Sequence, residues 1–318
     1  MHSEFDLIRR FFTHPAPGTV LGVGDDAALM RAAPGHELAV STDMLVGGQH
    51  FFLDTDPEKL GHKALAVNLS DMAAMGARPR WALLALALPE PDEAWLSAFA
   101  RGFMALAAEF HVDLVGGDTT RGPLSLCVTV LGEVPEGKAL RRDGAREGDD
   151  VWVSGSVGDA ALALAHLKRQ AVLEPADAAW CLSRLDAPTP RVALGVALRG
   201  IAHAAIDVSD GLAADLGHIL ERSKVGAIVE LSRLPRSAVL ERLADRKLAT
   251  TCMLAGGDDY ELLFTAPAGV RQVIEDLGRE QGLRVTRIGR VTAGAGLTVL
   301  GEDGAPMVLE RTGFDHFR

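Results

Sequence analysis

Hydrophobic and polar residues follow one another along this chain in short segments that alternate between strand and helix patterns. In the first half, 36–44 has β-favouring residues that end at a polar tip, and 112–117 and 124–134 have the same character. Residues 56–77 and 91–110 have the periodicity of amphipathic helices. The first half of the chain is therefore predicted to form a mixed sheet with helices.

The second half repeats this alternation after a turn-rich, charged segment at 135–150. We place the domain boundary there, between an N-terminal domain at 1–140 and a C-terminal domain at 148–318. The predicted fold class is α/β (α+β) with two domains, the second also α/β. Its expected strands are 151–155, 204–210, 227–232, 260–266, 283–291 and 297–300, and its expected helices are 158–170 and 211–223.

The composition of the chain argues against several classes of function. The chain has 318 residues, 48% of them hydrophobic, and a formal net charge of -11, which disfavours non-specific nucleic-acid binding. No apolar run reaches the ~18–20 residues of a membrane helix, and the N-terminal residues do not resemble a signal peptide. We expect a cytoplasmic protein with no membrane partner. The three cysteines are far apart, which favours buried thiols over disulfides or zinc.

Aspartates next to glycine or hydroxyl residues recur at the predicted ends of elements. Carboxylates in apolar surroundings are rarely buried unless they are paired, capped or metal-bound. Several of them converging from different elements would suit Mg²⁺, and the lack of a His/Cys cluster argues against zinc. The set consists of Asp25 and Asp26 after Gly22 and Gly24, Ser41-Thr42-Asp43, Asn68 with Asp71, Asp118 in GGDTTRG, and Asp207, Ser209 and Asp210 in DVSDG.

Each of these motifs also has a purely structural interpretation. Asp207 or Asp210 could cap the helix that begins near Gly211, and Asp43 could be a polar strand end. Gly-Gly-Asp occurs in ordinary turns. The combined pattern favours function, because α/β proteins bind ligands at the ends of their elements.

Other nucleotide-binding signatures are weaker. Gly132–Lys138 has the spacing of a P-loop, but Ala139 follows where Ser or Thr would ligate the metal, so we interpret it as a hairpin-like turn. Residues 154–158, SGSVG, could cradle an anion or form only a strand-to-helix turn. The aromatic segment 313–317 could be a docked tail or a stacking platform.

Seven segments, in order along almost the whole chain, resemble the thiamine-monophosphate kinase family, within the aminoimidazole ribonucleotide synthetase superfamily. They are GVGDDAA, STDMLVGGQHF, NLSDMAAMGA, GGDTTRG, DVSDGLAADL, GGDDYEL and GFDHF. The resemblance implies two α/β domains of the aminoimidazole ribonucleotide synthetase-like fold. It also implies a homodimer formed through N-terminal strands, ATP as co-substrate, several Mg²⁺ ions, and thiamine monophosphate as the acceptor.

Carried over by position, the resemblance assigns roles to individual residues. The implied metal ligands are Asp26, Ser41, Thr42, Asp43, Asp71, Asp118, Asp207 and Asp210. The implied ATP contacts are Gly117, Asp118, Arg142 and Ser209, and the implied acceptor contacts are His50, Asp258 and Phe314. Asp258 stands where Glu is expected in many relatives, and Phe314 where some have Trp or Tyr.

The expected chemistry is direct in-line transfer of the γ-phosphate with no catalytic side chain acting as a general base. A phosphate monoester has a second pKa of ~6 and is largely dianionic at pH 7, so it needs no deprotonation. The alternatives are another ATP-using enzyme of the superfamily, a non-catalytic nucleotide or metal sensor, and a metal-dependent phosphohydrolase. Relatives that use a reactive N-terminal cysteine fit poorly, since no Cys precedes Cys127.

Overall fold

The computed structural model describes residues 4–314. It contains two compact units, one comprising Met1–Met72 and Ala77–Gly137 and the other comprising Ala73–Gly76 and Lys138–Arg318. Among the described residues, no helix is both long enough and apolar enough to cross a membrane.

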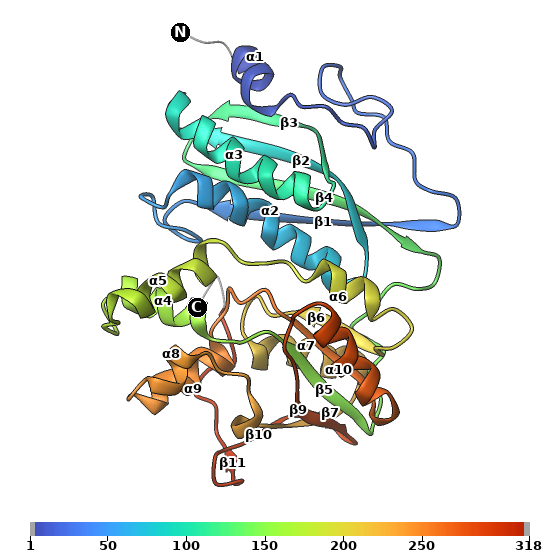
Figure 1. Cartoon of the computed structure of the whole chain (residues 1–318), viewed down its shortest axis with the longest axis vertical. Helices are drawn as coiled ribbons and strands as arrows, with labels where there is room; N and C mark the ends of the chain where they lie inside the picture. Colours follow the sequence, from blue (N-terminus) through green and yellow to red (C-terminus); the bar gives the residue numbers. More distant parts are fainter. Residues whose placement is uncertain (1–3, 315–318) are drawn as a thin grey trace. The chain divides into compact units, whose positions relative to one another are not determined.

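The first unit contains a four-stranded sheet with the order β1-β4-β2-β3. Its strands are β1 (His36–Val46), β2 (Arg78–Leu88), β3 (Asp113–Arg121) and β4 (Ser125–Pro135). The pairs β1/β4 and β2/β4 are antiparallel and β2/β3 is parallel, which confirms the predicted mixed sheet. Helices α2 (Pro57–Ala74) and α3 (Glu93–Glu109) lie along one face of the sheet (Figure 1). A short α1 (Glu4–Leu7) and a π-turn (Ile8–Phe12) precede them.

Local signals account for the ends of the helices in this unit. Asp56 accepts hydrogen bonds from the N–H groups of Glu58 and Lys59 and caps α2, as predicted. Gly76, at φ +61°, follows the end of α2 in the left-handed conformation that glycine tolerates best. Helix α3 is capped by Asp92, so Pro91 precedes the helix rather than lying in its first turn.

The central strand β2 was not predicted from the sequence. Its run RPRWALLALAL is nearly continuous in apolar residues and has no alternation. Buried runs of this kind cannot be assigned to a strand or a helix by periodicity alone. Only pairing with strands on both sides, β3 and β4, makes it a strand.

The second unit contains a seven-stranded sheet with the order β11-β10-β7-β9-β5-β8-β6. Its strands are β5 (Asp149–Ser154), β6 (Ala204–Asp207), β7 (Gly226–Glu230), β8 (Leu262–Pro267), β9 (Val285–Thr292), β10 (Gly296–Leu300) and β11 (Pro306–Met307). Its helices are α4 (Asp159–Leu167), α5 (Pro175–Asp186), α6 (Val192–Ala197), α7 (Leu212–Ser223), α8 (Ala238–Arg242), α9 (Arg246–Ala255) and α10 (Arg271–Glu280), with 3₁₀ turns at Leu231–Arg233 and Ala268–Val270.

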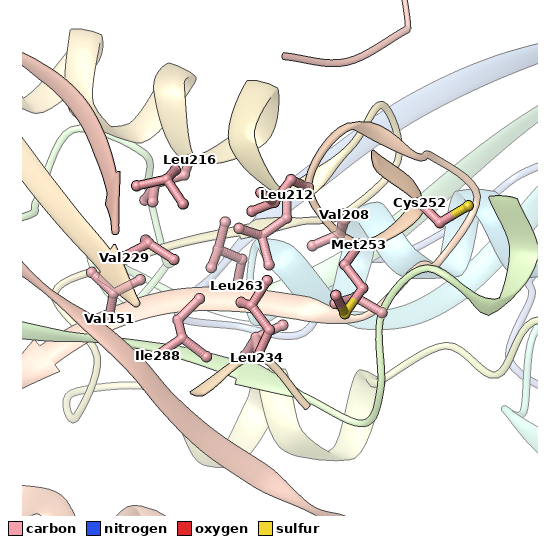
Figure 2. Close-up of a cluster of buried hydrophobic side chains, with 14 of the residues drawn as sticks. Val151, Val208, Leu212, Leu216, Val229, Leu234, Cys252, Met253, Leu263 and Ile288 are labelled. Atoms are coloured by element: carbon pink, nitrogen blue, oxygen red, sulfur yellow. The ribbon is translucent and has the colours of Figure 1, made fainter. Parts of the chain in front are cut away.

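The core of this unit forms between its sheet and its helices. Figure 2 shows Leu212 and Leu216 of α7 beside strand residues such as Val229 and Leu263, all of them fully buried. Met253 of α9 belongs to the same cluster. This core anchors β6, α7 and β8, whose connecting loops carry the acidic motifs of the second unit.

Candidate active site

Two acidic residues of the first unit, Asp43 on β1 and Asp71 on α2, lie beside each other. The Ser41 hydroxyl donates a hydrogen bond to Asp71 Oδ2 at 2.5 Å, and the Asp43 and Asp71 side chains interact directly. Side chains alternate along a strand, so Ser41, Asp43 and the buried Leu45 share the face that meets α2. The strand continues to Val46, so Asp43 lies inside it and not at its tip.

The electrostatics of this pair favour a bound cation. Burial, then the charge of Asp71 and a hydrogen bond with it, raises the pKa of Asp43 to about 6. No Lys or Arg side chain contributes to the shift. Two neighbouring carboxylates are stable only if they share a proton or bind a positive charge.

The donor atoms fit Mg²⁺ better than zinc. Ser41, Asp43 and Asp71 supply oxygens alone, the ligands that Mg²⁺ prefers. Within 4–314, no group of three or more His, Cys, Asp or Glu side chains is placed to hold a metal ion by itself. Mg²⁺ commonly takes one or two carboxylates and completes its shell with water and phosphate oxygens, so the pair suits such an ion.

Two other predicted ligands of this unit, Thr42 and Asp26, make different contacts. The Thr42 hydroxyl is on the opposite face of β1, where it donates to the Val128 carbonyl at 3.1 Å. Asp26 is exposed in the loop before β1, and its N–H donates to Asp25 Oδ1 at 2.9 Å. The structure does not bring the Thr42 side chain together with Asp43.

The Gly-Gly-Asp motif of the first unit lies within β3. A Cβ atom on Gly117, which has φ +150°, would lie 1.8 Å from the Leu84 carbonyl oxygen of β2, so only glycine fits there. Asp118 follows in register with Ala85 and is exposed. Glycine thus lets two strands approach closely just before an exposed carboxylate.

His50 lies in the turn after β1. Its Nδ1 accepts a hydrogen bond from the Val46 N–H at 3.0 Å, which requires Nδ1 to be unprotonated and leaves the proton on Nε2. This hydrogen bond fixes the orientation of the imidazole ring.

In the second unit, strand β6 ends at the buried Asp207 and leads into a tightly held loop. Asp215, inside α7, accepts hydrogen bonds from the N–H groups of Ser209, Asp210 and Gly211 at 3.0, 3.2 and 3.1 Å. The N-cap residue Gly211 provides no side-chain cap. Gly211, and neither Asp207 nor Asp210, therefore occupies the N-cap position of α7.

Asp210 and Asp215 form a second pair of neighbouring carboxylates. Burial, followed by the charge of Asp210, raises the pKa of Asp215 to about 7, although three backbone N–H groups act in the opposite direction. A positive charge near Asp210 would relieve this repulsion.

Two further motifs pack onto the same loop. The Asp258 N–H donates to the Ser209 carbonyl at 2.9 Å, and the Phe314 N–H donates to the Asp210 carbonyl at 2.9 Å. Tyr260 donates its hydroxyl hydrogen to Asp258 Oδ1 at 3.1 Å. The structure thus gathers four predicted residues of the second unit in one place. Phe314 is exposed, and the rest of its motif, 315–317, lies outside the described residues.

Several weaker signals from the sequence are now explained. Gly132 lies in β4, and a Cβ there would come within 2.7 Å of Met72 Sδ, so this glycine serves packing and not phosphate. The turn after β4 is not a hairpin, because β4 and β5 belong to different sheets. Arg142 is exposed, and among the described residues its side chain forms no ion pair, whereas Arg141 pairs with Asp143.

Two cavities of the second unit, of about 400 and 410 Å³, are lined by other residues, including Arg233, Arg236 and Arg284. None of the predicted site residues lines them. The candidate site is therefore defined by its acidic loops and not by these cavities.

Comparison with known proteins identifies the family. The chain matches the AIR synthase related protein N-terminal domain over 24–134 and the C-terminal domain over 146–302. It is 47% identical to the thiamine-monophosphate kinase of Salmonella typhimurium and 46% identical to that of Escherichia coli, each over 99% of this chain and 98% of the relative. The chain belongs to the thiamine-monophosphate kinase family. The resemblance predicted from the seven segments is confirmed.

Solved structures of this family have the same fold. Thiamine-monophosphate kinase from Stenotrophomonas maltophilia is 51% identical, with a TM-score of 0.86 over 92% of this chain and 93% of the other. AaThiL complexed with AMPPCP and TMP is 32% identical, with a TM-score of 0.79 over 98% of this chain and 96% of the other. Hydrogenase maturation protein HypE, 23% identical with a TM-score of 0.78, shares the fold alone.

Sequence reasoning missed three acidic residues that hold the loops of this kinase-family site, namely Asp215, Asp259 and Glu261. They are almost fully buried, at 2%, 3% and 0% exposure. The signal was present, since Asp215 lies within the segment DVSDGLAADL and Asp259 and Glu261 lie within GGDDYEL. Their inward direction depends on the backbone path, which the motif pattern does not specify.

Proposed function

We propose that this chain transfers the γ-phosphate of ATP to thiamine monophosphate and releases ADP and thiamine diphosphate. Support comes from the 47% identity to a thiamine-monophosphate kinase over 99% of the chain. The complex of AaThiL with AMPPCP and TMP supports a site that takes a nucleotide and an acceptor together. The structural observation that carries the proposal is the Asp43–Asp71 pair, two carboxylates whose repulsion calls for a cation.

Asp43 and Asp71, with the Ser41 hydroxyl, are proposed to hold Mg²⁺. When bound, Mg²⁺ would offset the repulsion between the phosphates of ATP and the acceptor and help align them in line. Asp43 must lose its proton to serve as a ligand. The further proposed ligands are Asp26, Thr42 and Asp118 in the first unit and Asp207 and Asp210 in the second.

Binding of ATP is proposed for Gly117, Asp118, Arg142 and Ser209. The close β2/β3 approach at Gly117 exposes main chain beside Asp118, and the Arg142 guanidinium is exposed for a phosphate.

Acceptor binding is proposed for His50, Asp258 and Phe314. Thiamine monophosphate carries a cationic ring, which the Asp258 carboxylate would attract and the exposed Phe314 ring could face by a cation–π contact. The His50 Nε2–H is a donor that suits a phosphate or ring acceptor. No side chain is needed to deprotonate the acceptor, because its phosphate is already ionised at neutral pH.

A homodimer is also proposed. Strand β1 is the edge of its sheet, and Leu38, Val40 and Met44 on one of its faces are 50%, 60% and 59% exposed. Exposed apolar edge strands commonly pair with another chain. Analytical ultracentrifugation would show a monomer if this proposal is wrong. A cytoplasmic location remains a prediction, which cell fractionation can test.

The decisive experiment is incubation of the purified protein with ATP and thiamine monophosphate, with and without Mg²⁺, followed by chromatography of the products. We expect ADP and thiamine diphosphate in equal amounts, and neither product without Mg²⁺. Release of inorganic phosphate without thiamine monophosphate would instead indicate a phosphohydrolase. Nucleotide binding without ADP formation would indicate a sensor.

A further inference from the structure

The Gly256–Tyr260 turn, which carries the proposed acceptor contact Asp258, has an unfavourable backbone. Asp258 and Tyr260 have φ values of +67° and +50°, in the left-handed region that side chains with a Cβ disfavour. Such residues persist only where neighbouring contacts hold them. The question is which groups provide that support.

One side of the turn rests on the loop after β6. The Asp258 N–H donates to the Ser209 carbonyl and the Tyr260 N–H donates to the Val208 carbonyl, at 2.9 and 2.8 Å. A Cβ on Gly257 would lie 2.2 Å from the Ser209 carbonyl oxygen, so the two loops are in close contact. Main-chain bonds thus set the position of the turn on this side.

The other side rests on the SGSVG turn. Both carboxylate oxygens of Asp259 accept a hydrogen bond from the Gly158 N–H at 2.9 Å. The turn that could have cradled a foreign anion therefore binds a side chain of the protein itself. The turn is thus held on one side by the Asp258 N–H on the Ser209 carbonyl and on the other by Asp259 on the Gly158 N–H.

Glu261, directly after the turn, has no solvent exposure and makes four strong contacts. Arg191 donates through Nε and Nη2 at 2.6 and 2.5 Å, Arg184 donates at 2.7 Å, and the Ser154 hydroxyl donates at 2.6 Å. A Cβ on Gly155 would lie 2.0 Å from Glu261 Oε1, so glycine is required beside the carboxylate. Helix α5 and the start of α6 are both tied to the residue that ends the turn.

We propose that Glu261, Arg184 and Arg191 form a clamp that positions Asp258 to bind the acceptor. Three hydrogen bonds from two guanidiniums converge on one buried carboxylate, although buried ion pairs add little stability compared with apolar packing. They do fix geometry, because a bidentate Arg–carboxylate pair constrains both partners. This inference rests on the proposed role of Asp258 in acceptor binding.

The test is Arg191→Lys, which keeps the charge but cannot form the two parallel hydrogen bonds. We expect the KM for thiamine monophosphate to rise about tenfold while the KM for ATP stays within about twofold of the wild type. Arg271→Lys is the matched control, because Arg271 also binds a buried carboxylate, Asp150, through two hydrogen bonds of 2.5 and 2.8 Å. The control should leave both KM values unchanged.

A second measurement tests the clamp without an activity assay. Amide hydrogen exchange in the 256–262 segment should accelerate in Arg191→Lys and not in Arg271→Lys. Unchanged exchange, or an unchanged KM for thiamine monophosphate in an active Arg191→Lys enzyme, overturns the clamp. A wild-type protein that does not phosphorylate thiamine monophosphate, or an Asp258→Ala variant with a normal KM, overturns instead the proposed function or the proposed role of Asp258.

Discussion

The Asp43 site of the first unit and the Glu261 site of the second unit hold their carboxylates in opposite ways. In the first unit, Asp43 lies against another acid, Asp71, and its pKa rises to about 6 through burial and that neighbour. In the second unit, Glu261 is fully buried but is met by Arg184 and Arg191. In one arrangement the neighbouring group that shifts the pKa is another acid, and in the other two guanidiniums donate to the carboxylate.

This difference separates a ligand-binding role from a positioning role. No Lys or Arg side chain is among the causes of the pKa shift of Asp43. The Asp43–Asp71 pair is therefore suited to bind a cation from solution. A carboxylate whose oxygens are already occupied by guanidiniums and a hydroxyl has little capacity left for a ligand. We therefore expect substitutions in the first pair to affect turnover and substitutions at Glu261 to affect stability and geometry.

The largest expected effect is on catalysis. Asp43→Asn should lower turnover by about 100-fold or more at saturating Mg²⁺, since it removes a charge proposed to hold the ion. Folding should be preserved, because the substitution relieves repulsion with Asp71. Steady-state assays and circular dichroism would check both expectations, with Asp54→Asn, at an exposed acid of the same unit, as the control. Turnover of Asp43→Asn equal to that of the control would remove the metal role.

The next effect is on stability. Glu261→Gln leaves two largely buried guanidiniums without their counter-charge and should lower the free energy of unfolding by about 3 kcal/mol. Glu302→Gln, which breaks the more exposed pair with Arg236, should cost about 1 kcal/mol or less. Urea denaturation measures both. Equal losses would mean that the clamp is no stronger than a surface ion pair.

A smaller effect is expected on the melting temperature when the pH is changed or the metal is removed. The folded protein holds the Asp43 proton more tightly than the unfolded chain does, so between pH 4 and about 6 ionisation of this group favours unfolding. In chelator, the melting temperature of the wild type relative to Asp43→Asn should therefore fall as the pH rises through this window. Adding Mg²⁺ should raise the wild-type melting temperature more at pH 7.5 than at pH 5.5. If Mg²⁺ raised the melting temperature of Asp43→Asn by the same amount, the proposed binding of Mg²⁺ by Asp43 and Asp71 would be contradicted.

The smallest effect contrasts the thiols of the two units. Burial, with nearby acids, raises the pKa values of Cys181 and Cys252 to about 12, so these thiols should stay protonated and unreactive at pH 8. Cys127 of the first unit is only half-buried. Titration with a chromogenic disulfide should detect about one reactive thiol in the folded protein and all three after unfolding. Rapid reaction of all three thiols in the folded state would show that the core of the second unit opens readily.

Much of this architecture could be predicted locally. The strand at β1, the helix after it with its Asp56 cap and Gly76 stop, and the β6–loop–α7 segment all follow from short-range periodicity and capping chemistry. Strand β2 could not be predicted in this way, because a continuous apolar run takes its identity from the strands that pair with it.

The sequence by itself determined the family and the acidic motifs, because these depend on which residues stand next to one another. Only the tertiary structure decided that Asp43 meets Asp71 across 28 positions of sequence. It also decided that Asp215 holds the loop amides and that two arginines surround Glu261. These are long-range contacts, and whether a carboxylate faces another acid or a guanidinium is set by the path of the backbone and not by its neighbours in sequence.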